Sequence, residues 1–256
     1  MSSPNSSTET LGDGIYVTRS SLADALVVSP ELGELLVQSR NAYAWRGSPR
    51  ESQKRMLDLT SDAARAMAAL NATTLQQLVA RIAKWDSGRT DAAIAGWTTD
   101  QREQARTALV ELHGGRNVRK GLLELDALPG LDLVLATKIY RFIAPAIGAA
   151  GDRHSTYFAN SLAVHDDDGP LTEATDFRRE WASGSHAASR WAIYGDKEVE
   201  ADEYAERYLP LLAGIAKALN ASGRQHTCAA RGVAVDWLPA DVEMAMAFWW
   251  AKHGPR

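Results

Sequence analysis

Apolar residues recur at the spacing of an α-helix along most of this 256-residue chain, and this pattern limits the possible folds more than any other feature. The clearest stripe lies within residues 49–71 and consists of Met56, Leu59, Ala63, Ala66, Met67 and Leu70. A helix with such a stripe buries it against other helices. The same spacing predicts further helices over 74–85, 99–113, 201–219 and from about 239 to 253. We therefore expect an all-α protein.

Helix-capping residues and segments without helical spacing predict the structure of the remaining parts of the chain. Ser20 is placed to cap a helix that runs through Val28, and Ser29-Pro30-Glu31 is a second helix start. Four other segments are expected to be non-helical, as strands at 15–18 and 233–237 and as loops at 165–180 and 223–232. Residues 1–14 are rich in Ser, Thr and Asn, which predicts a flexible tail.

Composition narrows the class of protein without indicating a partner. The chain is 45% hydrophobic, which suffices for one large domain or two closely packed lobes, and its net charge is −4. Cys228 is the only cysteine, so a disulfide framework, a multi-cysteine zinc site and a four-cysteine iron–sulfur cluster are all excluded. Neither a metal nor an organic cofactor is predicted. The polar start and the lack of a long apolar run favour a cytoplasmic protein that does not contact membranes.

The most informative segment is the turn Leu128-Pro129-Gly130-Leu131-Asp132, between helices predicted over 119–127 and 133–142. Gly130 supplies the backbone freedom that a tight helix–helix turn needs. The second helix presents unpaired N-terminal N–H groups, and such a terminus binds phosphate. The turn therefore predicts a point where a DNA backbone can approach closely.

Asp152-Arg153-His154 follows this turn, with Asp152 22 residues after Gly130. Turn, spacing and tripeptide together resemble the helix-hairpin-helix superfamily of endonuclease III and 8-oxoguanine DNA glycosylase. In that superfamily a hairpin Leu-Pro-Gly-apolar-Gly is followed about twenty residues later by an essential Asp, usually within Asp-x-His. The resemblance covers about forty residues. It implies a single two-lobed helical domain over 15–256, with the hairpin at 119–143 and double-stranded DNA as the partner of a monomer.

The resemblance also implies an activity, the excision of a damaged or modified base in DNA repair or in defence against modified foreign DNA. Asp152 would be the catalytic carboxylate, because a negative charge stabilises the oxocarbenium-like transition state of glycosidic cleavage. The target nucleotide would be flipped out of the duplex. The implied DNA-binding residues are Pro129, Gly130, Leu131, Asp132, Arg141, Arg153 and His154. Residues 113–160 contain six cationic and four acidic side chains, so the local positive excess is small.

Two residues depart from the superfamily pattern. Asp132 stands where the second hairpin glycine is expected, which places a negative charge beside the presumed phosphate. Val134 stands where bifunctional members carry a catalytic lysine, and Lys138 lies one helical turn further on. Lys138 is therefore a candidate Schiff-base nucleophile, although a phosphate-contacting or solvated lysine is the simpler interpretation. Because Val134 has no such chemistry, the resemblance favours a monofunctional glycosylase.

Other interpretations stay open at this point. Asp152 can cap the helix that follows it, which does not exclude catalysis. Glu243, in the first turn of the last helix, is better explained by the helix dipole than as a second catalytic carboxylate. The whole protein could be a non-catalytic DNA clamp that uses the hairpin, or a helical scaffold in which the hairpin is coincidental.

Overall fold

The computed structural model describes residues 11, 14–20, 25–87, 92–166, 169–175, 177, 179–181, 191–193 and 196–254. Most of these residues are helical, so the predicted helical class is confirmed in its coarse form. The predicted tail lies mostly outside the described residues. Leu11, which falls within that predicted tail, is 8% exposed and packs in the hydrophobic core.

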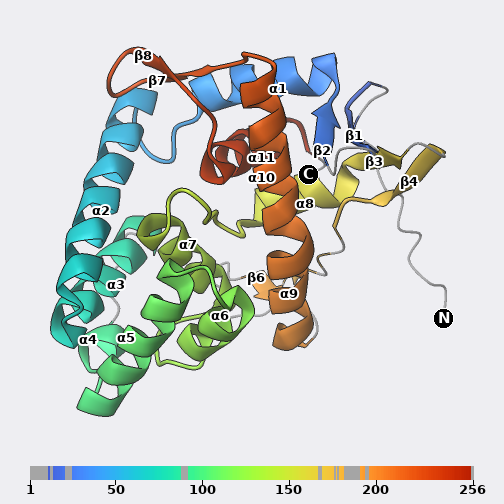
Figure 1. Cartoon of the computed structure of the whole chain (residues 1–256). Helices are drawn as coiled ribbons and strands as arrows, with labels where there is room; N and C mark the ends of the chain where they lie inside the picture. The colour runs from blue at the N-terminus through green and yellow to red at the C-terminus, as the bar shows by residue number, and fades with distance from the viewer. Residues whose placement is uncertain are drawn as a thin grey trace.

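A first set of helices packs together in the lower left of Figure 1. It consists of α2 (Pro49–Ala69), α3 (Ala72–Ser87), α4 (Ala92–Ala95), α5 (Thr99–His113), α6 (Val118–Asp126) and α7 (Leu133–Ile143). The stripe predicted on α2 faces the core from Met56 to Met67, whereas Leu70 is exposed and ends the helix in a left-handed conformation. Serine and threonine caps explain where α2 and α5 begin, because Ser48 and Thr98 each form a capping box.

The remaining helices form a second set, most of which packs on the C-terminal helix. It consists of α1 (Pro30–Ala42), α8 (Arg153–Ser161), α9 (Lys197–Glu203), α10 (Leu209–Ala221) and α11 (Pro239–His253). Helix α11 packs against α1, α8 and α10. A π-helical turn, η1 (Tyr204–Tyr208), joins α9 to α10, so the predicted helix over 201–219 is part of one longer helical run. Pro210 lies just after this wider turn and has no backbone N–H to donate.

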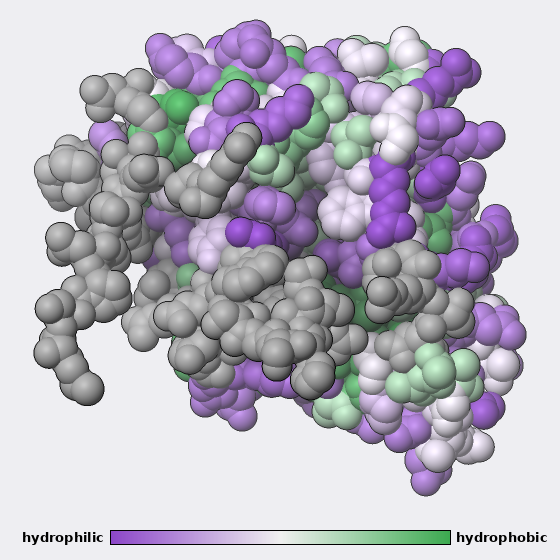
Figure 2. Space-filling model, turned by 180° about the vertical axis from the view of Figure 1, so that it is seen from behind, coloured by the Kyte–Doolittle hydropathy of each residue, from purple (hydrophilic) through white to green (hydrophobic). Residues whose placement is uncertain are grey.

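Both sets share one hydrophobic core. Large apolar side chains that stay exposed are few and scattered among the described residues, with Val27, Val199 and Val233 the most exposed. The face in Figure 2 agrees with this distribution, since hydrophilic residues dominate its described part and apolar ones lie between them in small groups. Burial of apolar surface is therefore the main force that holds the two sets together.

Short strands add a small β component to this mainly α-helical fold. Strands β1 (Tyr16–Ser20), β2 (Ala25–Val28), β3 (Ala163–Asp166) and β4 (Gly169–Glu173) form one sheet in the order β2-β1-β3-β4. Strands β1 and β3 are parallel, and the other two pairs are antiparallel. Two small hairpins complete the described strands, β5 (Arg179–Trp181) with β6 (Trp191–Ile193) and β7 (His226–Cys228) with β8 (Val233–Val235).

Several segment predictions change accordingly. The expected strands at 15–18 and 233–237 are confirmed, while the expected helix from Ser20 to Val28 is wrong because Ala25–Val28 pairs with β1 as a strand. Leu26 of β2 packs so closely on α10 that a Cβ at Gly214 would lie 2.4 Å from its Cδ1. The segment 165–180, expected to be a loop, contains the end of β3, all of β4 and the start of β5. The segment 223–232, also expected to be a loop, contains β7, which pairs with β8 across a turn.

Among the described helices, none has the length and apolar character needed to cross a bilayer.

Candidate functional site

The turn between α6 and α7 has the tight geometry that the sequence predicts. Gly130 adopts a φ of 84°, a left-handed conformation that glycine accepts without a steric penalty. Leu128 is buried beneath the turn, and Pro129, Gly130 and Asp132 are exposed. The indole N–H of Trp97, a buried residue, donates a 2.9 Å hydrogen bond to the carbonyl of Pro129. The turn is therefore held rigidly on its core side by Leu128 and Trp97, and its other side is open to solvent.

Asp132 has a definite structural role in this turn. It is the N-cap of α7, and its Oδ1 accepts a 2.7 Å hydrogen bond from the backbone N–H of Leu135. One of the donors that the sequence assigned to a phosphate is thus already engaged by a carboxylate. Any phosphate at this turn must therefore bind through other groups, such as the backbone N–H of Gly130, because Pro129 has no N–H and the N–H of Leu131 donates to the carbonyl of Leu128.

Lys138 is neither solvated nor placed on the outer surface of the hairpin. Its side chain is 9% exposed, and its Nζ lies 2.5 Å from Oδ1 of Asp86 at the end of α3. The ammonium also lies 5.3 Å from the ring centroid of Trp45, within the range of a cation–π interaction. This position corrects the expectation of a solvated lysine and places a buried cation between α7, α3 and the segment that joins α1 to α2.

Arg141 corrects the predicted DNA-binding set. Its side chain is 6% exposed, with Nη1 3.5 Å from Oε2 of Glu243 and Nη2 against the sulfur atoms of Met56 and Met244. Since α7 packs on α2 with this face inward, the guanidinium is directed away from any phosphate that approaches the turn. This burial could not be inferred from the sequence, because Glu243 lies 102 residues further along the chain.

Asp152 is the N-cap of α8, as the sequence predicts. Its Oδ1 accepts a 2.9 Å hydrogen bond from the backbone N–H of His154, and the side chain is 14% exposed. Burial alone would raise the pKa of this carboxyl, but the hydrogen bonding from His154 and the charge of Lys138 outweigh burial and hold the pKa well below its usual range. Asp152 is therefore an ionised carboxylate close enough to Lys138 to interact with it electrostatically.

The loop that leads to Asp152 is fixed by hydroxyl groups. The backbone N–H of Gly151 donates to Oγ1 of Thr137 at 2.8 Å. The hydroxyl of Tyr204 donates to the carbonyl of Ala149, and that of Tyr208 donates to Oγ of Ser155 at 2.8 Å. The two tyrosines come from η1, so the helical run that crosses the molecule sets the position of Asp152 relative to α7.

Arg153 and His154, the two other members of the tripeptide, are partly exposed. The Arg153 guanidinium lies 6.0 Å from the ring centroid of Tyr157. The His154 side chain is 36% exposed, and its Nδ1 lies 3.6 Å from Oδ1 of Asp152. Both side chains remain near the site, and His154 is placed to orient the carboxylate.

Glu243 is the residue that sequence reasoning set aside. It is 2% exposed on α11, and burial raises its pKa to about 8 even though Arg141 favours the charged form. Its carboxyl also interacts electrostatically with Asp152 and Lys138. Tyr43, at the end of α1, is buried near the same groups, and burial raises its pKa well above the usual range. The helix-dipole interpretation therefore misses that the side chain points into the junction of the two helix sets.

We call Lys138, Arg141, Asp152 and Glu243 the junction cluster. It brings together the two catalytic candidates from the sequence, Lys138 and Asp152, with Arg141 from the predicted DNA-binding set. The turn residues 129–132 precede α7 and do not belong to the cluster. Within the described part of the chain, no group of three or more His, Cys, Asp and Glu side chains is arranged to hold a metal ion. Comparison with protein-family models, curated proteins and solved structures found no match for this chain.

The raised pKa of Glu243 leads to a pH prediction. Between about pH 5 and pH 8 the folded protein holds a proton on Glu243 that the unfolded chain does not hold, so the free energy of unfolding decreases as the pH rises through this window. Glu243→Gln is uncharged throughout, so this decrease should shrink by about 1 kcal/mol or more, one pKa unit being worth about 1.4 kcal/mol.

Urea unfolding at several pH values measures this difference. Glu206→Gln, a change on the exposed face of η1, is the control and should keep the wild-type pH dependence. Equal pH dependence in wild type and Glu243→Gln would show that Glu243 is not protonated in the folded protein at neutral pH.

Proposed function

We propose that this protein is a monofunctional DNA glycosylase that hydrolyses the bond between a damaged or modified base and its deoxyribose. One observation carries the proposal: Asp152 is an ionised carboxylate, held at the start of α8 and close to the cation Lys138. It follows the tight turn between α6 and α7 at the spacing that the helix-hairpin-helix resemblance requires.

Hydrolysis of the glycosidic bond requires one negative charge close to the sugar ring. As the glycosidic bond breaks, positive charge develops on the sugar ring, and a carboxylate beside the ring stabilises it. The same carboxylate can orient the attacking water or accept its proton. His154 supports this role, because its backbone N–H fixes one carboxylate oxygen and its ring lies near the same oxygen.

The turn at 129–132 would supply positioning. The turn is short and exposed, so a phosphate can approach its backbone closely. Phosphate contacts position a duplex without reading its sequence. Arg141 has no part in this contact in our proposal. Its pairing with Glu243 instead stabilises the packing of α7 against α11, which keeps Asp152 and Lys138 close together.

A non-catalytic DNA clamp is the second candidate, and one observation favours it. The Asp152 carboxylate caps α8, which is a sufficient structural reason for an Asp at this position. Both candidates predict duplex binding, and only the glycosylase predicts base release.

Asp152→Asn separates the two candidates. Asparagine keeps the size of the side chain and can still cap α8, so the free energy of unfolding should change little. Loss of the negative charge should lower the rate of base release by about two orders of magnitude or more. The assay uses duplex oligonucleotides that each carry one modified base (8-oxoguanine, uracil, hypoxanthine or a methylated base), followed by alkali cleavage at abasic sites.

Asp196→Asn is a matched control, because it makes the same change at the N-cap of α9, outside the turn and the junction cluster, and should leave base release unchanged. If Asp152→Asn releases base at the wild-type rate, Asp152 is only a helix cap. If wild type releases no base from any substrate but binds the duplexes, the clamp is favoured.

The absence of lyase chemistry is tested separately. A lysine attacks the sugar as a free amine and forms an imine that borohydride reduces to a covalent adduct. Val134 has no such group, and the Lys138 nitrogen is engaged by the Asp86 carboxylate and the Trp45 ring. We therefore expect no borohydride-trapped protein–DNA adduct, and product DNA that breaks only after alkali treatment. A strong adduct that disappears in Lys138→Ala would instead identify Lys138 as the nucleophile.

A further inference from the structure

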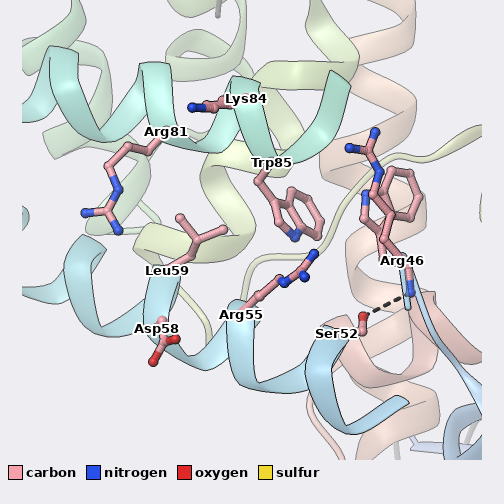
Figure 3. Close-up of a pocket in the computed structure, with 9 residues that line it drawn as sticks. Arg46, Ser52, Arg55, Asp58, Leu59, Arg81, Lys84 and Trp85 are labelled. Atoms are coloured by element: carbon pink, nitrogen blue, oxygen red, sulfur yellow. Dashed lines mark hydrogen bonds between the residues drawn. The ribbon is translucent and has the colours of Figure 1, made fainter. Parts of the chain in front are cut away.

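A pocket of about 560 Å³ lies between α2 and α3, outside the junction cluster. In Figure 3, Arg55 of α2 points across the pocket toward the indole of Trp85 on α3, and Leu59 lies beside that ring. The volume falls within the range of about 300–1,000 Å³ that is typical of small-molecule sites. The pocket is therefore large enough to hold an aromatic ring together with a polar group.

Two tryptophans form one wall of this pocket. The rings of Trp45 and Trp85 are stacked with centroids 5.4 Å apart, and Phe142 packs edge-on against Trp85 at 5.1 Å. Trp45 also has the Lys138 ammonium over its ring. Trp45 and Phe142 thus fix the orientation of Trp85, which lines the pocket as a rigid aromatic surface. A flat surface of this kind stacks well on nucleobases.

The indole N–H of Trp45 is an unusual feature of this aromatic wall. This nitrogen is buried and has no hydrogen-bond partner in the described structure. Buried polar groups without a partner are rare, because leaving a donor unsatisfied away from water is costly.

The pocket lining is strongly cationic for a protein with a net charge of −4. Arg46, Arg55, Arg81 and Lys84 line it, with Asp58 as the only acidic side chain in its lining. Arg81 pairs with Asp62. Arg55 and Lys84 are exposed and have no acidic partner at ion-pair distance among the described residues. Unpaired cations around an aromatic wall match a phosphate attached to a base.

We propose that this pocket binds a nucleoside 5′-phosphate unit, with the base on Trp85 and the phosphate near Arg55 and Lys84. Core packing explains why Trp45 and Trp85 stack, but it explains neither the buried unpaired N–H nor the free cations beside the rings. The proposal goes beyond base excision, because it concerns a second site that binds a nucleotide and does not catalyse a reaction. The unit can be a free nucleotide or an unpaired nucleotide of a DNA strand.

Calorimetric titration at low salt with dGMP, deoxyguanosine and deoxyribose 5-phosphate tests the proposal. We expect dGMP to bind at least about tenfold more tightly than either fragment, because only dGMP supplies both the base and the phosphate. Arg55→Ala should weaken dGMP binding about fivefold or more. Lys54→Ala is the matched control: it removes the neighbouring exposed cation of α2, which does not line the pocket, and should leave binding unchanged.

Trp85→Leu removes the stacking surface and is measured only if its circular dichroism spectrum is native. Arg55→Glu is the second variant, and it should abolish binding without touching the core. Equal affinity for dGMP and deoxyribose 5-phosphate, or equal effects of Arg55→Ala and Lys54→Ala, would overturn the proposal. Asp152→Asn should retain dGMP binding, so this result is independent of base release; loss of binding in Asp152→Asn would move the nucleotide to the junction cluster and also overturn it.

Competition identifies the source of the nucleotide. If a single-stranded purine hexanucleotide displaces dGMP, the pocket accepts a nucleotide within a DNA strand. If dGMP binds and the hexanucleotide does not compete, the pocket binds free nucleotides.

Discussion

The rest of the structure depends on buried charges that must be paired. Lys138 pairs with Asp86 and Arg40 with Asp241, and both cations are less than 10% exposed. A buried charge that loses its partner costs about 3–5 kcal/mol. These pairs therefore fix α7 to α3 and α11 to α1. Apolar burial brings the helices together, and the ion pairs decide in which register they meet.

This pairing has a chemical consequence at Asp152. The cation Lys138 is held at the junction of the two helix sets, and its charge helps keep the Asp152 carboxyl ionised despite burial. Burial instead raises the pKa of Glu243, in the same cluster, so this carboxyl holds its proton near neutral pH. Two carboxyl groups with opposite ionisation in one cluster are typical of acid–base sites, since the environment sets a separate role for each. The proposed excision chemistry uses the ionised one.

The sequence predicted what depends on neighbours along the chain. Caps at Ser29 and Asp152 and the glycine at position 130 act within a few residues, so the helix starts and the tight turn could be inferred. The burial of Arg141 and the role of Glu243 could not, because each depends on a partner about a hundred residues away. The same holds for β3, whose parallel partner β1 lies near the start of the chain, and for the Trp45–Trp85 stack.

The central claim is that the turn between α6 and α7 binds the DNA backbone, and duplex binding as a function of salt tests it most directly. We predict micromolar or weaker affinity that decreases steeply as the salt concentration rises, because bound phosphates release counterions. Gly130→Val should weaken this binding, since a β-branched residue does not tolerate the left-handed backbone at this position. Gly232→Val introduces the same backbone strain in the exposed turn between β7 and β8 and should bind as wild type does. Binding that does not depend on salt, or no binding at low salt, would contradict the account.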